Sequence, residues 1–193
     1  MSRPEAAIAD TAGEQPSSAR WWSLIVDPAS LVTRSLDGVG APAALLLSTL
    51  AFTTISLQAA LDLARSRGDA AADLAGLVLR GALLGSAGVA AMGLAAWVLT
   101  RPFGGPGPGA ALRAVGGAYA SALVYGLVGL GLNLVLGWNT AISCGVTGLL
   151  WAIGPLFLAL RELAGGRAGV AALLSTLCGA GMLSGWVWWG VGP

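Results

Sequence analysis

The chain has 193 residues, of which 56% are hydrophobic and only 10% are charged, and its mean hydropathy is +0.79. Soluble domains carry about 25% charged residues, so this composition excludes an ordinary water-soluble globule. The net charge of +1 gives no clustered cations for nucleic acid, and the lack of histidine excludes imidazole metal ligands and Ser-His or Cys-His nucleophile pairs.

The N-terminal segment differs from the rest of the chain. Met1–Ala19 is rich in Ala, Ser, Pro, Glu and Gln and lacks aromatic residues, which predicts a disordered tail. Trp21 and Trp22 suit the headgroup level of a bilayer. Pro28–Leu36, with Asp27 as its N-cap, is too short to span a membrane and is predicted to form an interfacial helix.

Five apolar segments are long enough to cross a bilayer, because about 20 helical residues span a hydrocarbon core of about 30 Å. They cover about 41–61, 74–100, 113–136, 141–160 and 168–189. The third and fourth belong to Ala114–Leu160, which contains no Asp, Glu, Lys or Arg and has turn residues at Gly137–Thr140. The predicted fold is therefore all-α: a membrane domain over residues 20–193, with a short interfacial helix before five transmembrane helices.

Two of the connections between spans are distinctive. Asp62–Asp73 and the Gly/Pro-rich Arg101–Leu112 are both predicted to be loops. Asp62, Asp69 and Asp73 could face a divalent cation, but two arginines lie between them, so we interpret this segment as a solvated loop. We expect no metal, cofactor or prosthetic group.

The arginines set the expected orientation, because cytoplasmic loops carry an excess of cations. With the N-terminus inside, the cytoplasmic side holds Arg3, Arg20, Arg34, Arg101, Arg113, Arg161 and Arg167. The outer side then holds Arg65 and Arg67. We therefore predict a cytoplasmic N-terminus and an outside C-terminus.

Small residues four apart occur on several spans. Gly81 and Gly85, like Gly181 and Gly185, have the spacing that lets helix backbones approach each other in lipid. The spacing predicts close packing within the monomer, with a homodimer face as the alternative.

Five residues within the spans are candidates for a structural or functional role. Pro155 should kink the fourth helix near Trp151, whose carbonyl loses its partner, as a fixed kink or as a hinge. Asn133, Gln58 and Tyr119 are expected to form hydrogen bonds between helices.

The spans offer little for catalysis. Ser121 and other serines are present, but no His or Lys is available to activate them, and no Asp or Glu falls within the spans. Cys144 and Cys178 are interpreted as small apolar helix residues. We therefore expect a protein that is not an enzyme.

The order of several short motifs resembles the bacterial branch of the YIP (Ypt/Rab-interacting protein) domain family over about Trp21 to Trp189. The motifs are Trp22–Pro28 (similar to Trp-x-x-Leu-Ile-x-x-Pro), Phe103-Gly104-Gly105, Ala111–Val115, Gly117-Ala118-Tyr119-Ala120-Ser121, Leu150-Trp151 and Leu160-Arg161-Glu162. The resemblance implies a five-span protein of a bacterial cytoplasmic (inner) membrane without an assigned reaction. The Rab partner of eukaryotic relatives is not carried over, because the acidic element before span one is not seen.

Two functions are compatible with these features. The first is a non-enzymatic scaffold that organises lipid or binds a partner, either a second copy or another membrane protein, through helix packing and cytoplasmic loops. The alternative is a small transporter or channel component, motivated by Pro155, Asn133 and Gln58 within the spans. It predicts a hydrated cavity lined by those residues, whereas a dry, glycine-packed interior favours the scaffold.

Overall fold

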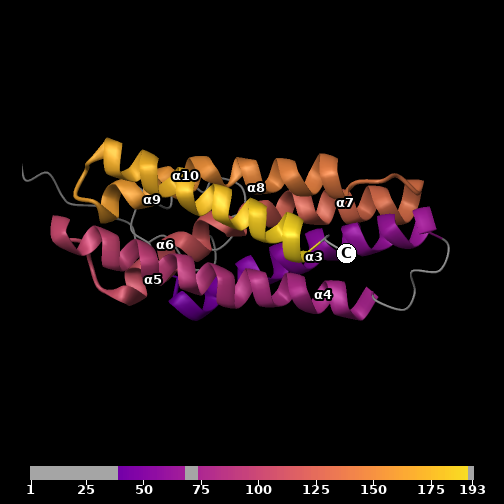
Figure 1. Ribbon diagram of the computed structural model, residues 1–193, viewed down its shortest axis with the longest axis horizontal. Coiled ribbons are helices and arrows are strands. Elements are labelled where there is room, and N and C mark those ends of the chain that lie inside the picture. Colours follow the sequence, from indigo (N-terminus) through magenta and orange to yellow (C-terminus); the bar gives the residue numbers. More distant parts are fainter. Residues whose placement is uncertain (1–38, 68–73, 191–193) are drawn as a thin grey trace, which may run out of the picture.

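The structure, a computed structural model, describes residues 39–67 and 74–190, and this part of the chain is helical without any strand. The long helices run roughly along one axis and form an elongated bundle (Figure 1). Five of them are long and apolar enough to cross a membrane. The expected tail over 1–19, the expected interfacial helix over 28–36, and Asp69 and Asp73 lie outside the described residues.

Helix α3 (Ala41–Arg67) is the most deeply packed of the five. It contacts the second and third long helices and the start of the fourth, and its Ala51, Phe52 and Ile55 are fully buried. The other four long helices are built from shorter pieces. These pieces are α4 (Leu74–Leu83), η4 (Leu84–Gly88) and α5 (Val89–Thr100); α6 (Pro108–Ala120) and α7 (Ala122–Leu136); η6 (Ala141–Val146), α8 (Thr147–Trp151) and α9 (Ile153–Leu163); and α10 (Ala168–Gly185) and η7 (Trp186–Gly190).

The two ends of the bundle are built differently. At one end, the 3₁₀ turn η5 (Arg101–Phe103) and the connection between α9 and α10 meet, with the Arg167 guanidinium 4.6 Å from the centre of the Phe103 ring. At the other end lies the short turn between α7 and η6 (Figure 1). Gly137 ends α7 with a φ of 68°, a left-handed conformation that glycine adopts without steric cost. The hairpin turn expected at Gly137–Thr140 is confirmed.

Two helix boundaries differ from the sequence-based expectation. Helix α3 continues past Leu61 to Arg67, so the prediction that Asp62 belongs to a solvated loop is wrong. Asp62 and Arg65 stand one turn apart, with 3.7 Å between the carboxylate and the guanidinium, and both bind the neighbouring hairpin. The expectation that no Asp or Glu falls within the spans is therefore wrong: Asp62 lies in the first helix of spanning length, and Glu162 lies in the fourth, which continues past Leu160 to Leu163.

The third long helix begins at Pro108 instead of about Arg113. Proline is favoured in the first turn of a helix, where its missing N–H would have no intrahelical acceptor. The Gly/Pro-rich connection is therefore shorter than expected.

The fourth long helix is interrupted near Pro155, as the sequence predicts. Helix α8 ends at Trp151 and α9 begins at Ile153, so the break falls at Ala152. Pro155 is buried within the bundle.

Glycines allow the helices to approach α3 closely. A Cβ atom at Gly85 would lie 2.8 Å from both the Ser48 carbonyl oxygen and the Thr49 Cα of α3. Gly116 of α6 similarly faces the backbone of Ala44. Gly81 and Gly85 therefore pack within the monomer, while Gly181 and Gly185 of the fifth long helix face Met92 and Leu84 of the second.

These contacts make a direct test possible. Gly85→Ala should lower the free energy of unfolding by about 1–3 kcal/mol, because the added methyl group meets backbone atoms that cannot rotate away. Gly131→Ala is a matched control on α7, where a Cβ has no atom within 4 Å, and its stability should be unchanged or slightly higher. Unfolding in mixed detergent micelles measures both. Equal stabilities of the two variants would contradict the packing.

Candidate functional site

Three polar side chains lie along one face of α3 near its C-terminal end. Gln58, Asp62 and Arg65 are spaced four and three residues apart, which places them on the same side of a helix. Gln58 is fully buried, and its amide nitrogen donates a hydrogen bond of 2.7 Å to the Gly126 carbonyl of α7. The face points at the hairpin formed by α7 and η6.

Asp62 joins α3 to both helices of this hairpin. Its Oδ1 accepts a hydrogen bond of 2.5 Å from the side-chain amide of Asn133 in α7. Its Oδ2 accepts a hydrogen bond of 2.8 Å from the backbone N–H of Ala141, the first residue of η6. That N–H has no acceptor within its own helix, because the first turn of any helix leaves its donors unpaired.

Arg65 binds the other side of the same turn. Its guanidinium donates to the Asn133 carbonyl at 3.0 Å, to the Asn133 side-chain oxygen at 2.6 Å and to the Trp138 carbonyl at 3.2 Å. The Asn133 carbonyl lies in the last turn of α7 and also accepts the backbone N–H of Gly137, whereas the Trp138 carbonyl lies in the turn that follows.

The charges of the pair match the polarity of the helix ends. A helix carries partial positive charge at its N-terminus and partial negative charge at its C-terminus. Asp62 lies at the N-terminus of the fourth long helix and Arg65 at the C-terminus of α7, so both ends are complemented by α3. Thr140 adds a third link, because its hydroxyl donates to the Gly129 carbonyl of α7 at 2.9 Å.

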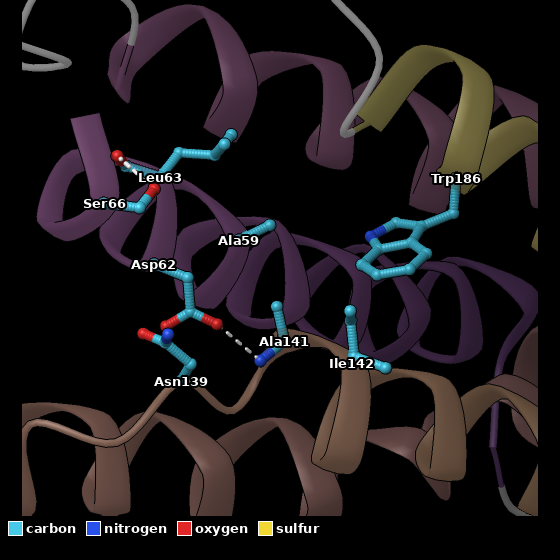
Figure 2. A pocket seen from close by; sticks show the side chains of 8 residues that line it. All are labelled: Ala59, Asp62, Leu63, Ser66, Asn139, Ala141, Ile142 and Trp186. Carbon is cyan, nitrogen blue, oxygen red and sulfur yellow. Dashed lines mark hydrogen bonds between the residues drawn. The ribbon is translucent and has the colours of Figure 1, made fainter.

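A cavity of about 270 Å³ lies beside this network, and Figure 2 shows the side chains around it. Its lining comes from α3, from the hairpin turn and η6, and from η7. The lining residues are Ala59, Asp62, Leu63, Ser66, Asn139, Ala141, Ile142 and Trp186. Most of the wall is apolar, and Asp62 is its only charged member among the described residues. Both η6 and η7 are π-helical turns, which recur at functional sites.

The candidate residues from the sequence fall into separate places. Gly104 and Gly105 lie in the turn after η5, where Gly105 approaches the Leu163 carbonyl, and exposed Arg161 and Glu162 end α9 nearby. Asn133 is at the opposite end, in the Asp62–Arg65 network. The structure therefore does not bring the whole set into one site.

The remaining candidates lie in the middle of the bundle. Tyr119 is buried against the Phe52 ring at 5.6 Å, and its hydroxyl donates to the Cys178 carbonyl of α10 at 3.3 Å. Ser121 lies between α6 and α7, and its hydroxyl donates a hydrogen bond to the Ala118 carbonyl at the end of α6. Trp151 is 59% exposed, and its ring is tilted by 49° to that of Tyr125, with 6.1 Å between the ring centres.

Arg65 and Trp186 were not among the candidate residues from the sequence, and Asp62 was considered only as a possible cation ligand and then assigned to a solvated loop. The available signal was the spacing of Gln58, Asp62 and Arg65, which continues one helical face beyond the apolar run. No sequence pattern places Trp186 next to α3.

Among residues 39–67 and 74–190, no group of three or more His, Cys, Asp or Glu side chains could hold a metal ion. Comparisons with protein-family models, with curated proteins and with solved structures find no match to this chain.

The Asp62 network predicts coupling between residues. Asp62→Ala should lower the free energy of unfolding by about 2–3 kcal/mol, because it leaves the Ala141 N–H and Arg65 without their carboxylate. Asn133→Ala should also lower the free energy of unfolding. In the double variant, the loss of unfolding free energy should be smaller than the sum of the two single losses by at least about 1 kcal/mol.

Ser66→Ala is the control for this experiment. It lies one turn from Asp62, but its hydroxyl bonds only to Leu63 of its own helix, so its effect should stay within about 0.5 kcal/mol. Strict additivity of Asp62→Ala and Asn133→Ala would mean that the two side chains do not interact.

Proposed function

We propose that the protein is a non-enzymatic, multi-pass scaffold of a bacterial cytoplasmic membrane, similar to YIP-domain proteins. It works through helix packing and by presenting its cytoplasmic loops to a partner, either a second copy or another membrane protein. The observation that carries the proposal is that the polar side chains within the spans form hydrogen bonds between helices. Gln58, Asn133 and Tyr119 each bind a neighbouring helix.

The contacts around α3 support the same proposal. Gly81, Gly85, Gly116, Gly126 and Gly129 all face α3 at distances that leave no room for a side chain. A transport pathway needs polar groups directed at a hydrated space, and ionisable groups along it are the usual mark of one. Gln58 instead lies fully buried between α3 and α7, hydrogen-bonded to backbone.

The end of the bundle that carries η5 is the proposed cytoplasmic platform. Its two connections are locked together, with Gly165 close to the Phe103 carbonyl and the Arg167 guanidinium stacked on the Phe103 ring. Arg101 lies over Trp97 at 5.8 Å in the same region. A reporter that works only in the cytoplasm should be inactive at the C-terminus, and an active one would reverse this orientation.

A small transporter or channel component is the second candidate, and the helix break at Ala152, three residues before Pro155, is the observation that favours it. An interrupted helix can move as a hinge or can be fixed by its neighbours. Pro155 and Leu156 are both buried, which favours the fixed form.

Reconstitution distinguishes the two functions. Liposomes that contain the purified protein should retain calcein and swell in glycerol or sugar solutions at the same rates as protein-free liposomes. If the unmodified protein transports one of these solutes and Pro155→Ala abolishes the transport, the scaffold function is refuted and the transporter function is supported.

In native membranes, a photoreactive residue at exposed Arg161 should give a discrete protein crosslink. The same residue at Val135, which is 81% exposed on the apolar surface of α7, should give lipid adducts only. Identical adducts from both positions would remove the proposed cytoplasmic platform.

A further inference from the structure

Trp186 forms part of the wall of the cavity beside Asp62. It is only 3% exposed, its indole Nε1 is itself buried, and this N–H has no acceptor among the described residues. Figure 2 shows the nitrogen on the ring edge turned toward the space between Ala59 and Ala141. A buried donor without a partner costs about 1–3 kcal/mol, so an acceptor supplied from outside would be stabilising.

Two of the other polar side chains in the described lining already have hydrogen-bond partners. Both Asp62 oxygens accept hydrogen bonds, and the Ser66 hydroxyl donates to the Leu63 carbonyl. The third, Asn139, is exposed. The Asp62 charge is compensated by Arg65, which extends toward Asn133 and Trp138. No cation is among the described lining residues. The cavity therefore suits an uncharged acceptor and disfavours a phosphate or a carboxylate.

The depth of the cavity defines the source of that acceptor. About 30 Å of helix separates Asp62 from Ala41, where α3 begins, and this length equals the thickness of the hydrocarbon core. The ester groups of glycerolipids lie at this boundary, directly outside the hydrocarbon. Trp188, 84% exposed, and Trp189 follow Trp186 at the same end, as expected of an interfacial aromatic belt.

The cavity also has an apolar route to the bilayer. Ile142 lines it while being 79% exposed, so its side chain joins the cavity wall to the outer surface of the bundle. Leu63, Ala59 and Ala141 continue the apolar wall inward. An acyl chain can lie along these side chains without any charged group entering.

We propose that this cavity binds the ester region of one membrane glycerolipid. The ester carbonyl accepts the Trp186 Nε1 hydrogen bond, and the first methylene groups of the acyl chain pack on Leu63 and Ile142. The headgroup stays outside, near exposed Ser66 and Asn139. This inference rests on the membrane location in the proposed function but not on the scaffold role. The lipid-binding test below can therefore fail while the liposome flux test succeeds, and the reverse.

The test compares two lipids that differ only in the ester carbonyl. The full chain in maltoside detergent is titrated with a short-chain diacyl phosphatidylcholine and with its dialkyl ether analogue, and each Kd is obtained from the lipid-dependent rise in Tm. The ester lipid should bind about two- to tenfold more tightly, the value of one hydrogen bond. Equal Kd values would overturn the proposal.

Two variants assign the effect to Trp186. Trp186→Phe keeps an aromatic ring but removes the N–H, so the ester-to-ether ratio should fall to about one. Trp188→Phe, two residues away and exposed, should retain the ratio of the unmodified chain. A ratio that survives in Trp186→Phe would also overturn the proposal.

A spectroscopic measurement covers the case in which Trp186→Phe does not fold. In the unmodified chain, the indole N–H proton resonance of Trp186 should move downfield with the ester lipid and stay in place with the ether lipid. The same movement with both lipids would show that the carbonyl is not the acceptor.

Discussion

The structure depends on the way the C-terminal turns of α3 hold the hairpin between α7 and η6. One carboxylate, that of Asp62, accepts from the first backbone N–H of one helix and from a side-chain amide of the other. One guanidinium, that of Arg65, binds the carbonyls of Asn133, in the last turn of α7, and of Trp138, which follows α7. The first four N–H groups and the last four carbonyl groups of a helix have no partner within it, and burying them without another partner costs free energy.

This arrangement also explains why an ion pair is tolerated at the end of an apolar helix. Charged groups are expensive in hydrocarbon, and the cost falls toward the interface and with good hydrogen-bonding partners. Asp62 is only 15% exposed, yet both of its oxygens are paired, and Arg65 reaches outward along the turn. The glycines of α4, η4, α6 and α7 complete the arrangement, because they allow the second and third long helices to approach α3 closely.

Much of the fold could be predicted from the sequence, because long uncharged apolar segments indicate helices of membrane-spanning length. The five segments, the turn at Gly137 and the break before Pro155 all follow from local signals. The end of α3 could not be located this way, because hydropathy falls at Asp62 whereas the helix continues. What extends it is a long-range contact to Asn133 and Ala141.

The candidate site was less accessible to sequence reasoning. Asn133 was singled out as a polar residue in a span, but its partners are 71 and 68 residues earlier in the chain. In the sequence, Trp186 is one of three tryptophans near the end of the fifth apolar segment, and only the fold distinguishes it from exposed Trp188. Its buried indole N–H depends on how η7 packs, which no local pattern encodes.

The most direct test of this account is hydrogen exchange of the Ala141 backbone amide in lipid nanodiscs. If the Asp62 carboxylate accepts from this amide, its exchange should be as slow as that of the hydrogen-bonded amides within α7, although it stands at the first position of its helix. An Ala141 amide that exchanges as fast as the amide of Asn139 in the adjoining turn would contradict the account.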